Sequence, residues 1–195
     1  MNNYASYYNQ KQMIARVDRD GHVLGKIEKW EAHRKGILHQ GFTVALVFDN
    51  TYIVQHRKHP AFDGVFDITT SSHQLFVDGV LQTTIDAVYD TLKREWNLEP
   101  KDLEGVPKED GAIYYKAPDP ESEFTEHEYC YIFSASVKKL PIPNFDFAYG
   151  YSLLTKEEFA RKNPRIYKNF SPWVKKMIEM KFILSSSEKG VIHES

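Results

Sequence analysis

Cysteine is almost absent from this sequence, because Cys130 is the only one in 195 residues. A single cysteine excludes an intramolecular disulfide and a zinc site made of several thiolates. Long hydrophobic runs are missing too: no stretch of about 18 apolar residues occurs, and the N-terminus lacks the charged-then-apolar pattern of a secretory signal. These absences predict a soluble, cytoplasmic protein without a transmembrane helix.

Neither sign of charge is in excess. The chain has 25 lysine and arginine residues against 27 aspartate and glutamate residues, which gives a formal net charge of −2. Without a basic field, we expect neither nucleic acid nor a membrane surface as a partner, and an anionic ligand would have to be bound by a local cluster of cations. The sequence does not indicate an oligomeric state.

The sequence does have enough apolar material for one packed domain. Hydrophobic residues make up 42% of the chain and aromatic residues 14%, and the length suits a single domain. No internal repeat or long linker divides it. We therefore predict one domain over 13–183, between a flexible N-terminal segment at 1–12 and a flexible C-terminal tail at 184–195.

Strands are predicted on both sides of one central helix. Apolar segments rich in β-branched and aromatic residues predict strands at 13–18, 22–27, 42–48, 51–56, 112–117, 128–137 and 148–154. The helix is indicated by apolar residues three or four positions apart, namely Leu81, Ile85, Val88, Leu92 and Trp96. Two more helices are expected within 155–163 and 171–183, where a capping box and an early proline occur. This order predicts an α+β fold, an α/β/α sandwich with a mixed sheet flanked by helices.

Two glutamates and three histidines are the first candidates for chemistry. Glu126 and Glu128 are two positions apart, so on a strand they share one face, where their carboxylates repel each other unless a cation lies between them. His33, His39 and His73 are expected near the same end of the buried strand. Together the five residues could form a nitrogen and oxygen site for Mn²⁺, Mg²⁺ or Zn²⁺. The alternative is a solvated strand end with ordinary surface or core histidines.

Several short motifs occur in a recognisable order. They are Lys29-Trp30-Glu31-Ala32-His33, Leu38-His39, Ser71-Ser72-His73, Tyr115-Lys116-Ala117-Pro118-Asp119-Pro120, Glu126-x-Glu128-x-Cys130 and Ser171-Pro172-Trp173. In this order and at these spacings, they resemble the metal-dependent, Nudix-fold class of isopentenyl diphosphate isomerase. The resemblance covers about residues 13–180. It implies a Nudix fold and a role in isoprenoid biosynthesis.

The resemblance also implies a role for individual residues. As ligands of one divalent metal, Mn²⁺ or Zn²⁺, it gives His33, His39, His73, Glu126 and Glu128. It assigns Glu95 to a Mg²⁺ ion that bridges the diphosphate, and it assigns the diphosphate itself to Lys29, Arg57 and Lys58, with help from His59. Beside the reacting alkene it places Tyr115, Glu128 and Trp173. Without the resemblance, Glu95 would be an ordinary solvated helix residue and Trp173 a core residue.

The chain departs from the resembled pattern in two places. Ser71 stands where the isomerases have a catalytic cysteine, and a serine hydroxyl does not ionise near neutral pH as a thiol does. Cys130 is not an obvious substitute, because on a strand it shares the face of Glu126 and Glu128. The Nudix box is degenerate as well: Glu95 remains, but Arg94 stands where another glutamate is expected, which disfavours an ordinary Nudix pyrophosphohydrolase.

Three functions follow from the sequence as alternatives. The leading one is an isopentenyl diphosphate isomerase-like protein that binds a divalent metal and a small-molecule diphosphate. The second is a divergent Nudix hydrolase that acts on a diphosphate-containing substrate. The third is a non-catalytic protein that binds a diphosphate. The sequence leaves the organic part of the substrate and the identity of the metal open.

Overall fold

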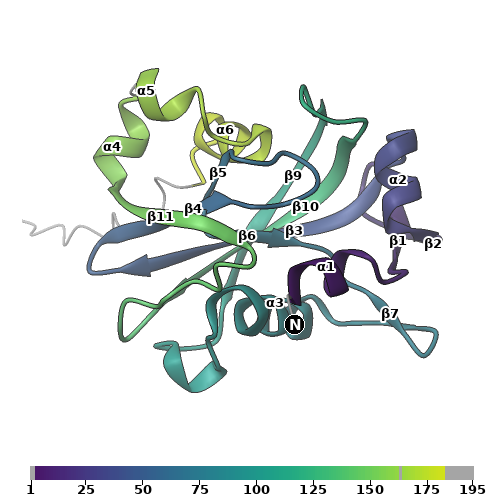
Figure 1. Cartoon of the computed structure of the whole chain (residues 1–195), viewed down its shortest axis with the longest axis horizontal. Helices are drawn as coiled ribbons and strands as arrows, with labels where there is room; N and C mark the ends of the chain where they lie inside the picture. Colours follow the sequence, from purple (N-terminus) through teal and green to yellow (C-terminus); the bar gives the residue numbers. More distant parts are fainter. Residues whose placement is uncertain (1–2, 163, 183–195) are drawn as a thin grey trace, which may run out of the picture.

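Two long parallel strands form the centre of the sheet in the computed structural model, which describes residues 3–162 and 164–182 (Figure 1). β3 (His39–Phe48) runs beside β10 (Thr125–Ser136), and their register places His39 opposite Glu128. β9 (Lys108–Pro118) pairs with the other side of β10 in antiparallel orientation. The parallel pairing therefore brings the start of β3 next to the two glutamates of β10.

The other edge of β3 is shared by three strands. Along its length it pairs with β1 (Met13–Val17), β6 (Thr70–Ser72) and β4 (Thr51–Arg57). The sheet continues with β2 (Val23–Glu28) beside β1, and with β5 (Phe66–Asp67) and β11 (Ala148–Thr155) beside β4. Asp49 and Asn50, with φ angles of 47° and 60°, make the tight turn between β3 and β4. Two left-handed residues in this turn match the right-handed twist of the strands that they join.

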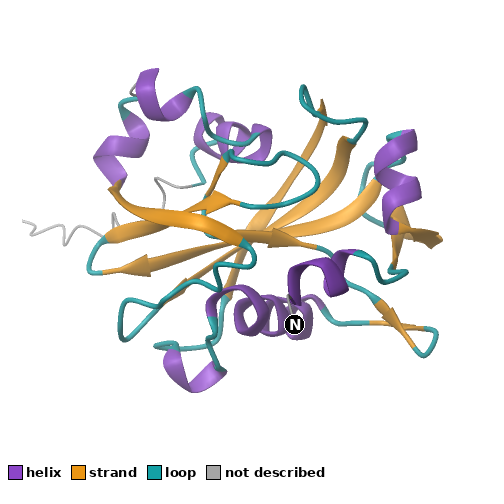
Figure 2. Ribbon diagram, in the orientation of Figure 1, coloured by secondary structure: helices purple, strands orange, loops and turns teal. Residues whose placement is uncertain are grey.

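Helices cover both faces of the sheet (Figure 2). On one face lies α3 (Thr84–Trp96), and on the other lie α4 (Lys156–Ala160), α5 (Pro164–Tyr167) and α6 (Pro172–Glu179). The remaining elements are α1 (Asn3–Tyr8), α2 (Lys29–Lys35), the 3₁₀ helix η1 (Pro100–Asp102), and a small hairpin made of β7 (Phe76–Val77) and β8 (Val80–Leu81). The mixed sheet flanked by helices confirms the predicted fold class.

Alternation along the central strands divides the interior into two cores. On the α3 side the core includes Phe42, Val44, Leu46, Val88, Leu92 and Trp96. On the α6 side it includes Tyr115, Cys130, Ile132, Trp173, Val174 and Met177. Because side chains two apart share a face, Glu126 and Glu128 face the same side as Cys130. On the α6 side of β10, the two carboxylates therefore lie in line with the apolar side chains of Cys130 and Ile132.

The predicted strands and helices are present with shifted ends, but the short helices α1, α2 and α5 were not predicted. β3 begins three residues earlier than predicted, because its polar start is paired with β1 and β10. Leu81 belongs to β8 rather than to the helix, which begins at Thr84 after the Thr83 hydroxyl accepts a hydrogen bond from the Asp86 N–H at 3.2 Å. The helix α1 lies within the segment at 1–12, and the predicted tail at 184–195 lies outside the described residues. No helix of the described part is long and apolar enough to cross a membrane.

Candidate functional site

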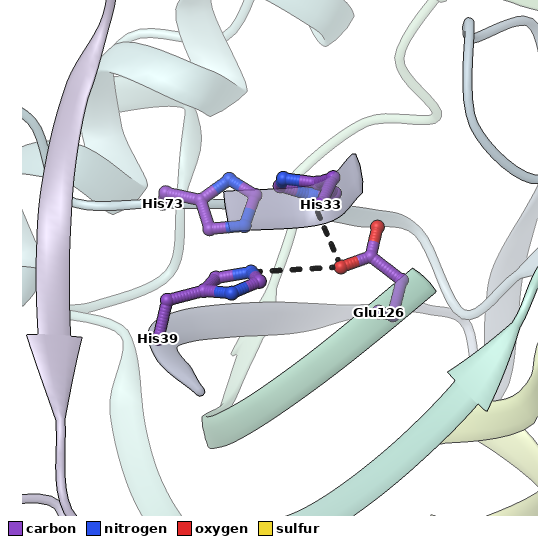
Figure 3. A group of neighbouring side chains, drawn as sticks. All are labelled: His33, His39, His73 and Glu126. Carbon is purple, nitrogen blue, oxygen red and sulfur yellow. Dashed lines mark ion pairs between the residues drawn. The ribbon is translucent and has the colours of Figure 1, made fainter. Parts of the chain in front are cut away.

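Four side chains from four different elements meet on the α6 side of the sheet (Figure 3). His33 comes from α2, His39 begins β3, His73 follows β6, and Glu126 comes from β10. One nitrogen or oxygen atom of each lies within 4.8 Å of the corresponding atoms of the others, and all four side chains are buried. We call these four residues the histidine cluster.

The closest approaches join imidazole nitrogens to carboxylate oxygens. Nε2 of His33 lies 3.2 Å from Oε2 of Glu126, and Nε2 of His39 lies 3.7 Å from the same oxygen. Glu128 lies at the edge of the cluster, where its Oε1 is 3.0 Å from Nε2 of His73 and 3.7 Å from Nε2 of His39. The structure thus brings together all five residues that the sequence proposed as metal ligands.

Local structure explains why the histidines point inward. Glu28 caps the start of α2 by accepting hydrogen bonds from the N–H groups of Trp30 and Glu31, and Gly36 ends the helix with a φ of 57°. Between these caps, α2 is a short helix whose buried face includes His33. His39 is buried because the first residue of β3 is paired on both sides, with β1 and with β10.

Backbone carbonyls determine which nitrogen of two imidazoles carries the proton. Nδ1 of His33 lies 2.6 Å from the carbonyl oxygen of Lys29, and Nδ1 of His39 lies 2.7 Å from that of Ile37. A carbonyl only accepts, so in each neutral ring Nδ1 donates the hydrogen and Nε2 keeps a lone pair. These lone pairs face Oε2 of Glu126, which is itself an acceptor, and none of the three atoms has a hydrogen-bond partner among the described residues.

Buried acceptors that face one another fit a bound cation. Ligands at about 2.1 Å from a metal stand about 3.0–3.4 Å apart, which is close to the nitrogen–oxygen distances of the cluster. A carbonyl that holds the far nitrogen of a histidine is the usual support of a metal-binding imidazole. His73 has no such support, and both of its ring nitrogens are buried without a hydrogen-bond partner in the described chain. The donor set of imidazoles and carboxylates suits a divalent ion such as Mn²⁺ or Zn²⁺.

Burial and neighbouring charge set the ionisation of the cluster. Burial acts to raise the pKa of Glu126, but the positive charge that His33 and His39 carry when they are protonated outweighs it, so that the pKa lies well below 4.5. Burial and the charge of Glu126 raise the pKa of Glu128 to about 7. Burial, with the neighbouring histidines, lowers the pKa of His73 well below 6.5. His73 is therefore neutral at physiological pH, which is the form that binds metals.

Gly41 makes room for Glu128. A Cβ atom at this position of β3 would overlap the Glu128 carboxylate, with only 2.6 Å to its Cδ. Any larger residue at position 41 would therefore push the carboxylate away from His39 and His73. No sequence pattern points to Gly41, because its importance depends on the parallel neighbour β10, which lies far along the chain.

A cavity beside the histidine cluster is lined by three cationic side chains, the buried Lys29 and Arg57 and the 19% exposed Arg94. Nη1 of Arg57 pairs with Oδ2 of Asp67 at 3.2 Å, and Nη2 of Arg94 pairs with Oε1 of Glu95 at 2.9 Å. Lys29 has no carboxylate within 4 Å among the described residues. The cavity therefore contains the local cluster of cations that an anionic ligand requires in a chain of nearly neutral net charge.

Tyr115, Trp173 and Ser71 line the same cavity. The Tyr115 hydroxyl donates a hydrogen bond to Oε2 of Glu128, and burial together with Glu128 raises the pKa of Tyr115. The indole N–H of Trp173 donates to Oδ1 of Asp67 at 2.8 Å. Oγ of Ser71 lies 3.1 Å from the same Asp67 oxygen. Asp67, which the sequence analysis did not single out, thus holds two of the proposed catalytic side chains.

Glu95 enters the cavity from the opposite face of the sheet, because it lies on α3. It is buried rather than solvated, and it accepts hydrogen bonds from the Thr70 hydroxyl and from Arg94. Arg94 also contacts the Ser72 hydroxyl at 3.3 Å. The solvated-helix alternative for Glu95 is therefore wrong, and Arg94 is a cavity residue in its own right.

Lys58 and Cys130 do not line the cavity. Lys58 follows Arg57 at the end of β4, and its ammonium group donates instead to the carbonyl of Phe145 at 3.3 Å, over the ring of Tyr149. Successive residues of an extended chain point to opposite sides, so the prediction that Lys58 and Arg57 share one ligand is not supported. Cys130 is buried on the side of Glu128, as expected, and burial raises the pKa of its thiol well above 9.0.

Comparisons with known proteins agree on the fold. No protein-family model and no curated protein matches the chain. Among solved structures, DR0079 from Deinococcus radiodurans has a TM-score of 0.63 at 15% identity, over 86% of this chain and 98% of that one. The MutT protein from Methanosarcina mazei Go1 has a TM-score of 0.56 at 11% identity, over 74% and 92%. The MutT NUDIX hydrolase from Burkholderia pseudomallei has a TM-score of 0.53 at 14% identity, over 73% and 96%.

These identities are low, so the likeness concerns the arrangement of the backbone and not the chemistry of the site. The agreement covers most of this chain and almost the whole of each neighbour. The mixed sheet with helices on both faces, which places the histidine cluster and the cavity at one end of β3 and β10, is a Nudix fold.

Proposed function

We propose that this chain is a metal-dependent enzyme that acts on a small organic diphosphate, as a divergent hydrolase of the Nudix fold. One observation carries the proposal: unpartnered acceptor atoms of His33, His39 and Glu126 face one another beside a cavity with buried cations. A divalent metal would account for the acceptors. A diphosphate would account for the cations.

The residues present fit two kinds of ion. His33, His39, His73 and Glu126, with Glu128 beside them, would hold Mn²⁺ or Zn²⁺. Glu95 would contact a Mg²⁺ ion that is bound to the diphosphate oxygens. Metal ions in such a site supply positive charge that polarises phosphoryl oxygens.

The side chains of the chain itself would bind and orient the substrate. Lys29 and Arg57 offer an ammonium and a guanidinium group to phosphate oxygens, and the planar guanidinium suits bidentate contacts. Glu95 is fixed in the cavity by Thr70 and Arg94, so its carboxylate can position a reacting group without first losing rotational freedom. Tyr7, Tyr8 and Trp173 line the cavity with aromatic surface, which would limit the access of bulk water.

A second candidate reaction is the allylic isomerisation of isopentenyl diphosphate. It is favoured by the contact between the Tyr115 hydroxyl and Glu128 and by the indole ring of Trp173, whose centroid lies 6.0 Å from that of Tyr115. An aromatic face stabilises a carbocation without reacting with it. The Arg57 guanidinium lies 5.3 Å from the Trp173 ring centroid, so a cationic intermediate would have to use the remaining aromatic surface.

One experiment separates the candidates. The purified protein is analysed for bound metal and then incubated with isopentenyl diphosphate in D₂O, and separately with a panel of nucleoside diphosphate derivatives. Release of phosphate or pyrophosphate would support the hydrolase and contradict a pure isomerase. Deuterium incorporation without phosphate release would support the isomerase instead. A metal-free protein without turnover would contradict both and favour the non-catalytic binding protein.

A further inference from the structure

The cations of the cavity are not equally neutralised by carboxylates. Arg57 and Arg94 each have one carboxylate partner. Lys29 is only 2% exposed, and its ammonium group instead faces the rings of Trp30 at 4.8 Å, Tyr8 at 5.2 Å and Tyr7 at 5.5 Å. A buried ammonium group that contacts aromatic rings and has no carboxylate within 4 Å among the described residues retains much of its cost of desolvation.

Arg94 has a buried N–H group that makes no hydrogen bond to the described residues. All of its hydrogen bonds to the side chains of Ser72, Thr91 and Glu95 are made by Nη2. Its Nε is buried and has no hydrogen-bond partner among the described residues. The guanidinium carbon lies 4.2 Å from the centroid of the Tyr7 ring. A buried N–H donor of this half-buried cation is therefore unused on a wall of the cavity.

Tyr7 lies between these two cations. Its ring is within cation–π distance of both Lys29 and Arg94, and it lines the cavity together with Tyr8. Burial raises the pKa of Tyr7, but the charges of Arg94 and Lys29 outweigh it, so that the pKa is lowered. The ring thus occupies a position whose surroundings favour negative charge.

The helix that carries Tyr7 is short and lies outside the sheet. α1 has six residues and lies on the α3 side of the sheet (Figure 1). The indole N–H of Trp30 donates to the carbonyl of Tyr8 at 2.9 Å, and the side chain of Gln12 donates to the carbonyl of Tyr7 at 3.5 Å. The Tyr7 ring also packs edge-on against Phe147 at 5.9 Å. Tyr8, the last residue of α1, packs against Trp30, His59 and Phe147. Because α1 takes no part in the strand pairing, it can move away without opening the sheet.

We propose that Arg94 and Lys29 form a binding site for a phosphate group and that Tyr7 occupies this site in the free protein, so that a diphosphate must displace α1 to bind. This inference rests on the proposed function and extends it to a residue, Arg94, that stands where a Nudix box would have a glutamate. The direct cation–phosphate contact would replace a carboxylate–metal–phosphate contact at this position. The tyrosine ring would close the site to water while no ligand is bound.

The first test compares Tyr7→Ala with Tyr7→Phe in the full-length protein loaded with Mn²⁺ and Mg²⁺. Inorganic pyrophosphate is titrated into each variant by calorimetry. Tyr7→Ala should bind about tenfold more tightly than the wild type, because removing the ring increases the population with an open site. Tyr7→Phe keeps the ring and should bind like the wild type. Tyr149→Ala, which removes an exposed tyrosine, is the control for general effects.

The second test addresses Arg94. Arg94→Gln in the Tyr7→Ala background should weaken pyrophosphate binding by roughly tenfold or more, the effect of a lost charge-assisted hydrogen bond. Lys93→Gln removes the same charge from the neighbouring position, whose side chain is 66% exposed and paired with Glu99, and should leave the affinity unchanged. Equal losses in the two variants would show that only net charge matters and would overturn the role of Arg94.

Hydrogen exchange of the α1 amides separates the displacement of α1 from the binding of a phosphate group as such. Pyrophosphate should increase exchange at residues 3–8 in the wild type, because the helix leaves its place. If pyrophosphate binds the wild type and Tyr7→Ala equally and α1 stays protected, displacement is wrong while the proposed function stands. If pyrophosphate binds neither protein in the presence of both metals, the phosphate site and the proposed function both fail.

Discussion

His39 and Glu126 show how single side chains define the candidate metal centre. The Ile37 carbonyl holds one nitrogen of His39, so the other nitrogen presents a lone pair to a carboxylate oxygen that also has no donor. Buried acceptors without partners cost free energy. A metal ion that binds only the folded chain removes this cost, and metal binding should therefore also stabilise the fold.

We predict that His39→Gln abolishes tight metal binding. The wild type, incubated with Mn²⁺ or Zn²⁺ and desalted, should retain an equimolar amount of metal by elemental analysis, and its melting temperature should rise with added metal. The variant should show neither effect. His127→Gln is the matched control, since this histidine lies on β10 between the two glutamates but faces Tyr114 and the carbonyl of Gly36. Retention of metal by His39→Gln would contradict the site.

Ser71 tests the isomerisation candidate. If only the acid/base group of the cysteine is missing, Ser71→Cys should raise the rate of isopentenyl diphosphate isomerisation by roughly 10²–10⁴, the usual contribution of a positioned proton transfer. The rate is measured by NMR as deuterium incorporation from D₂O. A variant that still binds the diphosphate but incorporates no more deuterium than the wild type would favour the hydrolase or the binding protein.

At the scale of elements, the pairing of β3 with β10 depends on a glycine. We predict that Gly41→Ala lowers metal affinity by about 10–100-fold, because the new Cβ displaces Glu128. The free energy of unfolding should also fall, by about 1–3 kcal/mol, as is usual for overpacking. Gly150→Ala on β11 is the control, since a Cβ there meets no atom within 4 Å. Metal titration and denaturant unfolding measure the two effects, and equal behaviour of the two variants would contradict the role of Gly41.

The helix α3 brings its own carboxylate to the cavity from the other side of the sheet. Glu95→Gln should weaken Mg²⁺-dependent binding of a diphosphate by about tenfold, because a neutral amide attracts a hard cation much less than a carboxylate does. The metal at the histidine cluster should stay bound. Asp90→Asn on the same helix is the control, since its side chain accepts from Gln82 at the exposed surface. The affinity for the diphosphate is measured by calorimetry with and without Mg²⁺. An unchanged affinity in Glu95→Gln would exclude a role of Glu95 in Mg²⁺ binding.

For the whole molecule, the buried histidines make stability depend on pH. Burial, together with the charges of Arg57 and Lys29, lowers the pKa of His59 well below 6.5. Below about pH 6.5 the unfolded chain binds a proton at this residue that the folded chain does not bind. The contribution of His59 to the free energy of unfolding is therefore fully present above this pH. As the pH decreases below it, the free energy of unfolding falls by up to about 1.4 kcal/mol per pH unit for one such histidine.

We predict that His59→Gln reduces this pH dependence. Urea unfolding of the metal-free protein between pH 7 and pH 5 should give a slope that is shallower in the variant than in the wild type. His22→Gln should change the slope little, because the side chain of His22 is 76% exposed. If His59→Gln and the wild type lose stability in parallel, His59 is not the neutral buried group that the structure indicates.

Sequence patterns predicted the main strands and three of the helices, but not α2, which carries His33. They also singled out five candidate metal ligands, whose binding of a metal stays a prediction. Alternation and turn residues predict the strands, since a strand with one buried face must alternate and a tight turn requires particular residues. The spacing of Glu126 and Glu128 predicts a shared face, which the structure confirms. The motif order indicated the Nudix fold, which the structural comparisons support.

Only the tertiary structure decided which residues meet. His33, His39, His73 and Glu126 lie far apart in the chain. The parallel pairing of β3 with β10 brings His39 beside Glu126, the pairing of β6 with β3 brings His73 close, and α2 adds His33. The pairing of β3 with β10 also places Gly41 against the Glu128 carboxylate, and this contact leaves no local signal in the sequence. Lys58 was misplaced because adjacency in sequence does not show toward which side a chain turns at the end of a strand. Long-range contacts cannot be derived from short-range patterns, because each pattern reports only the faces of its own element.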